Sequence, residues 1–145
     1  MKDRAAFWDT SAIVPLLVNQ AATQKARQFS RRYRRVVVWW GALIEAHNAI
    51  GRLARDGLLG EKARSQAVSL LSRLRSSWLE VQPTEDLREL AISLVEKYQL
   101  RSADLVQLAS ALVWCNNQPR RRPFVCFDDG LARAATVAGF EVFRL

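Results

Sequence analysis

The length and composition of the chain, 145 residues of which half are hydrophobic and a quarter charged, predict a single domain spanning residues 1–145 with a substantial core. They exclude a disordered chain, and no apolar run approaches the roughly 20 residues that a membrane-spanning helix needs. The 22 Lys and Arg residues outnumber 14 Asp and Glu, and the formal net charge of +8 favours a polyanionic partner, unless the arginines simply form a solvated face.

The first half of the chain alternates between short apolar runs and helical patterns. Ala5–Trp8 and Val36–Trp40 are apolar runs of the length of buried strands. Gly41–Arg55 and Glu61–Trp78 carry apolar residues on one side at helical spacing. This half therefore predicts two strands and two long helices.

The second half continues the alternation, with a weaker strand candidate at Leu79–Gln82 and stronger ones at Phe124–Phe127 and Glu141–Leu145. Three helices are predicted here. The first is capped by Thr84 and turns one apolar side inward, made of Leu87, Leu90, Ala91, Leu94 and Val95. The second begins at Ser102 or Asp104 and ends before Pro119, and the third is a short helix between Asp128 and Gly139. Strands that alternate with helices predict an α/β fold with a mostly parallel sheet covered on both faces.

Acidic residues fall where such a sheet would bring them together. Asp9 and Asp128 follow two predicted strands, whereas Glu45 and Asp104 lie near helix starts that face the same edge of a parallel sheet. Two carboxylates about 5 Å apart repel by about 3 kcal/mol at an effective dielectric constant near 20, so four of them require a cation. An all-oxygen site of this kind favours Mg²⁺ or Mn²⁺.

Each acid also has an explanation that needs no catalysis. Asp104 and Asp128 could be helix caps worth about 1 kcal/mol each. Glu45 could be a solvated helix residue, and Asp129 is an alternative to Asp128 as the fourth acid. The combination of the four positions is therefore more specific than any one of them.

Several blocks of the sequence resemble the conserved blocks of PIN domains, and of VapC-type toxins in particular. The blocks are Asp9–Ala12, the segment around Glu45, Leu100–Ala111 and Phe124–Ala135, and together they run from end to end of the chain. The resemblance implies a three-layer α/β/α fold with a mostly parallel central sheet of four to five strands. It also implies a homodimer and an antitoxin partner whose C-terminal segment occludes the active site.

By the same resemblance, the site residues would be Asp9, Glu45, Asp104 and Asp128 as metal-binding acids and Ser11 as a supporting hydroxyl. Two features depart from the family pattern. Cys126 stands where a Ser or Thr often precedes the fourth acid, and Trp40-Gly41 replaces small hydroxyl residues ahead of the second acid.

The predicted reaction is metal-assisted hydrolysis of RNA by an endoribonuclease that is the toxin of a toxin-antitoxin pair. Asp9, Asp104 and Asp128 would hold one or two ions, with Glu45 completing the site or orienting the attacking water. The alternative is a non-catalytic RNA-binding or scaffolding PIN domain. A response receiver is disfavoured because no lysine follows Lys97, and a haloacid-dehalogenase-like phosphatase because Asp9 is not followed by a second acid at Ser11.

The remaining polar and sulfur-containing residues give weaker indications. We expect Cys115 and Cys126 to be reduced core residues, as in a cytoplasmic protein, and the N-terminus has no signal-peptide core. His47 is a poor base because it lies two positions from Glu45 on a helix. The basic clusters are Arg31, Arg32, Arg34 and Arg35 before one predicted strand and Arg120, Arg121 and Arg122 before another, and both favour a nucleic-acid surface.

Overall fold

The computed structural model describes residues 4–145, and within them five parallel strands form one sheet in the order β3-β2-β1-β4-β5. The strands are β1 (Ala5–Trp8), β2 (Arg35–Trp39), β3 (Leu79–Val81), β4 (Pro123–Cys126) and β5 (Glu141–Arg144). All the predicted strands exist, with ends that differ by one residue at most from the predicted ones. The mostly parallel sheet is confirmed.

The central strand β1 marks the point where the chain changes direction across the sheet. From β1 the chain moves outward to β2 and β3, and it then returns to place β4 on the other side of β1. Ala6, Phe7 and Trp8 are fully buried, as expected for a central parallel strand covered on both faces. Ligands of open parallel sheets bind at such a reversal, beyond the carboxyl ends of the strands.

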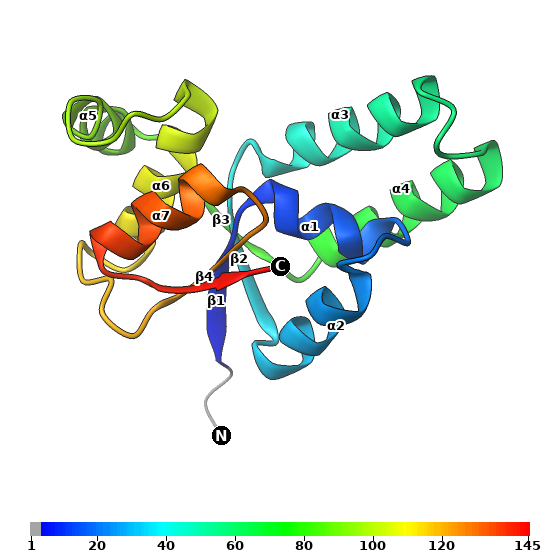
Figure 1. The fold of residues 1–145 in the computed structure, drawn as a ribbon, viewed down its shortest axis with the longest axis horizontal. Helices are drawn as coiled ribbons and strands as arrows, with labels where there is room; N and C mark the ends of the chain where they lie inside the picture. The colour runs from blue at the N-terminus through cyan, green and yellow to red at the C-terminus, as the bar shows by residue number, and fades with distance from the viewer. Residues whose placement is uncertain (1–3) are drawn as a thin grey trace.

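Helices cover both faces of the sheet, as Figure 1 shows. One face carries α1 (Thr10–Leu17), α2 (Thr23–Arg32), α3 (Ala42–Arg55) and α4 (Glu61–Arg75). The other face carries α5 (Glu85–Ser93), α6 (Ser102–Trp114) and α7 (Asp129–Ala138). Successive β1 side chains supply the two cores, since Phe7 packs with α6 and α7 whereas Ala6 and Trp8 pack with α1 and α3. The three-layer arrangement is confirmed.

Two helices were not predicted at all. In α1, Pro15 occupies a helix interior, where the missing N–H normally disfavours a helix. In α2, the buried residues are Thr23 and Ala26, so the apolar stripe that identifies a helix in a sequence is nearly absent. Both helices exist because tertiary packing against the β1 face overrides these weak local signals.

Some predicted boundaries and faces were wrong. The helix expected over Glu61–Trp78 ends at Arg75, and Trp78 is a buried residue of the connection to β3. Thr84 caps α5 as predicted, with its side chain accepting from the N–H of Leu87. Val95 was expected to face inward but is 53% exposed, because the helix has already ended at Ser93.

The predictions about the end of α7 and about the two cysteines are confirmed. Gly139 ends α7 in a left-handed conformation with φ of 112°. Cys115 and Cys126 are buried free thiols. None of the helices within residues 4–145 combines the length and the apolar character that crossing a bilayer requires.

Candidate active site

Asp9 and Asp128 follow the carboxyl ends of the adjacent strands β1 and β4. The backbone N–H of Asp9 donates to Val125 O at 2.9 Å, which fixes the two strand ends together. Each acid also caps the helix that follows it: Asp9 Oδ2 accepts from Ser11 N at 3.3 Å, and Asp128 Oδ2 accepts from Leu131 N at 2.9 Å. The capping role proposed for Asp128 is thus correct, yet it occupies a single oxygen of the carboxylate.

Glu45 lies in the first turn of α3 and is held from several elements at once. Its Oε1 accepts hydrogen bonds from Thr10 Oγ1 at 3.1 Å, Trp39 Nε1 at 2.8 Å and Gln107 Nε2 at 3.1 Å. The interpretation of Glu45 as an ordinary solvated helix residue is therefore wrong. Because one oxygen takes all of these donors, the carboxylate is fixed in orientation, and within residues 4–145 no hydrogen bond reaches Oε2.

Asp104 lies in the first turn of α6, and Arg101, not Asp104, occupies the cap position of that helix. The cap interpretation of Asp104 is therefore wrong. Its nearest cationic partner is the exposed Arg101, with Nε 3.8 Å from Asp104 Oδ2. Such a long contact with a solvent-exposed side chain leaves most of the carboxylate charge uncompensated.

The acids act on one another electrostatically. Burial raises the pKa of Asp9 to about 6; the Ser11 hydroxyl opposes this rise, while the charges of Asp104 and Glu45 add to it. Burial also raises the pKa of Asp104, with a further contribution from Asp128 that Arg101 opposes. Asp9 is thus linked to Asp104 and Glu45, and Asp104 to Asp128. The four predicted acids form one electrostatically coupled group.

Ser11 connects Asp9 to the end of β4. Its hydroxyl donates to Asp9 Oδ2 in a short hydrogen bond and accepts from the backbone N–H of Phe127 at 3.1 Å. Cys126 lies beside these groups with Sγ 3.9 Å from Asp128 O. Burial, together with the charges of Asp9 and Asp128, raises the pKa of the Cys126 thiol to about 12, so this residue is a neutral thiol at pH 7.

The two neighbouring acids Asp128 and Asp129 have different environments. Asp128 is partly buried, and its charge raises the pKa of both Asp104 and Cys126. Asp129 is exposed and forms an ion pair with Arg144, with Asp129 Oδ1 2.6 Å from Arg144 Nη1. The geometry therefore favours Asp128 as the fourth member of the group.

Thr10, Trp39 and Gln107 belong to the site, although the sequence did not assign them a role. Gln107 left a weak signal, because it is a polar residue in a run of helix residues that is otherwise buried and largely apolar. Trp39 left none. Its indole reaches Glu45 because position 41 is glycine: a Cβ at Gly41 would overlap the Trp39 ring. The departure at Trp40-Gly41 is thus part of how this chain holds its second acid.

The predicted basic clusters lie away from the acids. His47, which the sequence disfavoured as a base, is exposed on α3. The basic clusters precede β2 and β4. Arg34, Arg35 and the cluster before β4 therefore lie at the amino ends of these strands, at the opposite edge of the sheet, and Arg31 and Arg32 form the last residues of α2, which leads there. The cluster before β4 helps to line a hollow of about 480 Å³ there, together with Arg4 and Tyr33. The clusters therefore do not surround the candidate active site.

The donor set fits a hard divalent cation in its chemistry. Asp9, Glu45 and Asp128 each use one oxygen to hold their position, and within residues 4–145 no hydrogen bond reaches the other oxygen. The raised pKa of the buried Asp9 also marks a carboxylate that lacks a compensating positive charge. In the described part of the chain no three acidic, His or Cys side chains are as close as the ligands of a single ion, so ion binding would have to draw these carboxylates together.

Several solved structures similar to this one are described as toxins or as members of toxin-antitoxin systems. VapC20 of Mycobacterium tuberculosis, described as a sarcin-ricin loop cleaving toxin, is 21% identical, with 97% of this chain and 99% of that chain covered and a TM-score of 0.67. A VapBC-5 structure from the same organism is 19% identical, with 97% and 98% covered and a TM-score of 0.61. A toxin-antitoxin complex from Klebsiella pneumoniae is 15% identical, with 88% and 90% covered and a TM-score of 0.60.

These likenesses establish the fold. The fold implied by the resemblance to PIN domains of the VapC type is thereby confirmed. No protein-family model matches the chain, and no curated protein matches its sequence.

Proposed function

We propose that this chain, which has the fold of VapC-type PIN domains, is a metal-dependent endoribonuclease and the toxin of a toxin-antitoxin pair. The observation that carries the proposal is the position of Asp9 and Asp128 after the adjacent strands β1 and β4, where the strand order changes direction, with Glu45 and Asp104 in the first turns of α3 and α6. The charges of these acids also raise the pKa of Asp9 and Asp104. Carboxylates gathered in this way destabilise a folded protein unless they bind a cation. Their retention together is best explained by a function that uses one.

In this proposal Asp9, Asp104 and Asp128 hold Mg²⁺ or Mn²⁺, one or two ions in number, and Glu45 completes the site. The bound ion would lower the pKa of a water molecule and neutralise charge that develops on the phosphate. Ser11 keeps Asp9 in position through its short hydrogen bond. Glu45 is held through Oε1, and its Oε2 would be available to orient the attacking water.

RNA is the proposed substrate. The formal net charge of +8 favours a polyanion, and the similar VapC20 is described as a toxin that cleaves the sarcin-ricin loop. The cytoplasm is the compartment in which such a substrate is met. The sequence that is cut follows neither from the acids nor from phosphate contacts, because phosphate contacts carry no sequence information.

A cognate antitoxin and a second copy of this chain are the proposed protein partners. The neighbours include toxin-antitoxin complexes. An apolar hollow of about 250 Å³ also lies between Trp39 and α5, where Ile92 is 63% exposed. Exposed apolar surface of this kind is typical of a protein interface, and Trp39 links it to Glu45. A protein seated there would lie beside the acids.

The test is RNA cleavage by purified protein with Mg²⁺ or Mn²⁺ on structured RNAs. Asp9→Asn, Asp104→Asn and Asp128→Asn should each lose roughly 100- to 1000-fold in rate, the range seen when one transition-state-stabilising group is removed. Asp129→Asn is the matched control, because Asp129 is exposed and paired with Arg144. It should retain activity close to that of the wild type.

Two outcomes would contradict the proposal. Equal cleavage by the wild type and the Asp9→Asn variant would indicate a contaminating nuclease. RNA binding without cleavage under every divalent ion would instead support the alternative, a non-catalytic RNA-binding or scaffolding PIN domain.

A further inference from the structure

Phe127 is an exposed aromatic residue directly next to the acids. It lies between the end of β4 and Asp128, and the residue is 50% exposed. Its backbone is nevertheless held on both sides: its N–H donates to Ser11 Oγ at 3.1 Å, and its carbonyl oxygen accepts from Arg144 Nε at 3.4 Å. The protein thus presents an aromatic ring to solvent from a fixed backbone, which burial in the core does not explain.

A hollow of about 470 Å³ lies in front of Phe127, and we call it the base hollow. It is lined by Ser11, Val14, Gln20, Ala21, Ala22 and Phe127. Most of these side chains are apolar, and Gln20 adds an amide that can both donate and accept hydrogen bonds. The volume is in the range of small-molecule sites. Ser11 both lines this hollow and donates a hydrogen bond to Asp9, so the hollow is adjacent to the acids.

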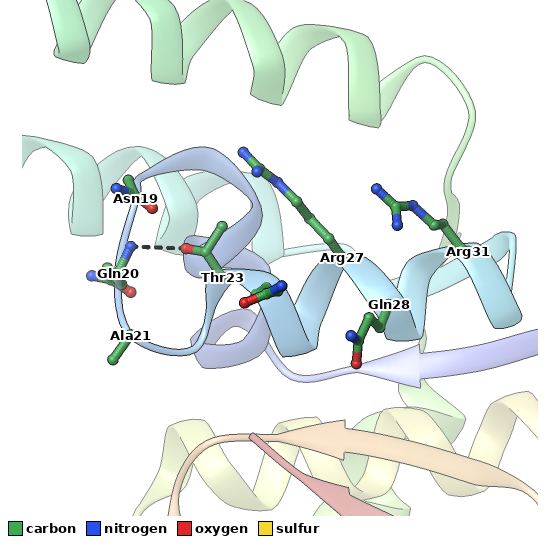
Figure 2. A pocket seen from close by; sticks show the side chains of 8 residues that line it. Asn19, Gln20, Ala21, Thr23, Arg27, Gln28 and Arg31 are labelled. Carbon is green, nitrogen blue, oxygen red and sulfur yellow. Dashed lines mark hydrogen bonds between the residues drawn. The ribbon is translucent and has the colours of Figure 1, made fainter.

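A second hollow, of about 430 Å³, continues from the first, and we call it the α2 hollow. The two share Gln20 and Ala21. Arg27 and Arg31 line the α2 hollow, and they lie one helical turn apart and extend from the same side of α2 (Figure 2). Neither arginine forms an ion pair with another residue in the range 4–145.

The loop that joins the two hollows is ordered by its own hydrogen bonds. The backbone N–H of Gln20 donates to Thr23 Oγ1 at 2.8 Å, the contact drawn in Figure 2. Thr23 Oγ1 in turn donates to Pro15 O at 2.7 Å, and Thr23 is buried. The Gln20 amide is therefore carried by a loop with a defined backbone conformation.

We propose that the base hollow binds one unpaired nucleobase stacked on Phe127, and that the strand continues along α2 with its phosphates on Arg27 and Arg31. This inference rests on the proposed function and names its substrate class, single-stranded or looped RNA with a base turned out of the stack. Aromatic rings bind such bases face to face, and arginine forks bind phosphate. An acid group, an aromatic ring and a cationic track in succession match a nucleotide chain better than they match a protein segment.

Binding without cleavage tests the stacking contact. The probe is a fluorescein-labelled single-stranded RNA of about 12 nucleotides, within the usual footprint of such sites, measured by anisotropy with EDTA present. Phe127→Ala should weaken binding about 5- to 150-fold, the factor equivalent to loss of one stacked base. Phe127→Trp should restore it. An RNA of the same length with abasic riboses should bind wild type and Phe127→Ala equally.

The phosphate track is tested with the same probe. Arg27→Gln together with Arg31→Gln should weaken binding to the normal and the abasic RNA alike. It should also reduce the slope of log K against log salt by about 1.4, the value for two single-strand phosphate contacts. The control with the same charge loss is Arg88→Gln together with Arg133→Gln, on the helices of the opposite face, which should leave the slope unchanged.

The outcomes separate this proposal from the proposed function. Unchanged affinity of Phe127→Ala for the normal RNA overturns the base hollow, whereas metal-dependent cleavage lost in Asp9→Asn would still stand. An equal loss on the normal and the abasic RNA also overturns it, since Phe127 would then act without contacting a base. Loss of antitoxin binding with intact RNA binding in Phe127→Ala assigns the hollow to a protein. A base-dependent Phe127 effect with no cleavage by any variant keeps the hollow and removes the hydrolytic function.

Discussion

At the residue scale, Asp9 illustrates how the fold changes the ionisation of a carboxylate. Its backbone position at the end of a buried strand removes most of its solvent, and burial is the main cause of its raised pKa. Asp104 and Glu45 add repulsion, while Ser11 compensates part of it with a hydrogen bond. The ionised form of Asp9 therefore destabilises the folded protein unless a positive charge lies beside it, as the proposed cation would.

The pH dependence of stability follows from that pKa. Folding raises the pKa of Asp9 from 3.8 to about 6, so the folded state favours the protonated form. The contribution of Asp9 to the free energy of unfolding is therefore highest below pH 4 and falls as the pH rises from 4 to 6. Above pH 6 this contribution is lower by about 3 kcal/mol than below pH 4. Asp9→Asn avoids this loss. In urea unfolding with a chelator, it should be more stable than wild type at pH 8 and similar at pH 4.

The control for this measurement is Asp129→Asn, which removes an exposed carboxylate of the same size. It should lower stability slightly at pH 8, because it loses an ion pair with Arg144. A metal-free Asp9→Asn protein that unfolds more easily than wild type at pH 8 would contradict the assignment of burial as the cause of the pKa rise.

At the element scale, the junction between β2 and α3 determines how Glu45 is presented. Trp39 ends β2, and Gly41 leaves space for its indole, which donates to Glu45 one turn into α3. The same carboxylate is reached from α1 by Thr10 and from α6 by Gln107. Helices of both faces of the sheet therefore meet at one oxygen, and the position of Glu45 depends on how these elements pack.

Two glycines of this region give contrasting predictions. Gly41→Ala should displace the Trp39 ring, since the new methyl group would overlap it. We expect a loss of about 10- to 100-fold in cleavage rate, as for other residues that orient a ligand, and a lower unfolding midpoint. Gly51→Ala, within the same helix, meets the flexible end of Arg55 at 3.4 Å. It should retain activity and gain about 0.5–1 kcal/mol of stability, because alanine favours the helix.

Paired rate measurements and urea titrations check these two variants. If Gly41→Ala cleaved RNA as fast as Gly51→Ala, the orientation of Glu45 by Trp39 would have no role in the reaction.

At the scale of the whole molecule, charge is distributed unevenly between the two ends of the sheet. The acids gather at the carboxyl ends of β1 and β4, whereas Arg4 and Arg120 lie in a basic hollow at the amino ends of the same strands. A chain with a formal net charge of +8 therefore still has a locally anionic site. That site takes its residues from segments spread along the chain, so a cation bound there would link them.

Thermal melting tests this linkage. Mg²⁺ or Mn²⁺ should raise the melting temperature of the wild type, since a ligand that binds the folded state alone stabilises it by about 2.7 kcal/mol at one hundred times its Kd. The increase should be smaller in Asp9→Asn. A monovalent salt at matched ionic strength is the control for unspecific screening. An equal increase in wild type and variant would show that the cation binds elsewhere.

Much of the fold was predictable from local sequence. The strands, the caps formed by Thr84 and Asp128, and the end of α7 at Gly139 all depend on residues within a few positions of each other. Helices α1 and α2 were not predictable in this way, because Pro15 and a nearly uniform polar surface hide them. Their formation depends on packing against the sheet.

The sequence by itself determined the α/β alternation and the four acids that could meet at one edge of the sheet. Tertiary structure alone decided that Glu45 is held by Thr10 and Gln107, residues 35 and 62 positions away, and that Asp128 faces the acids whereas Asp129 turns to Arg144. The physical reason is the distance along the chain over which each kind of interaction acts. Propensity and periodicity act over about one helical turn, whereas hydrogen bonds and charge coupling depend on distances that exist only after the strands have assembled.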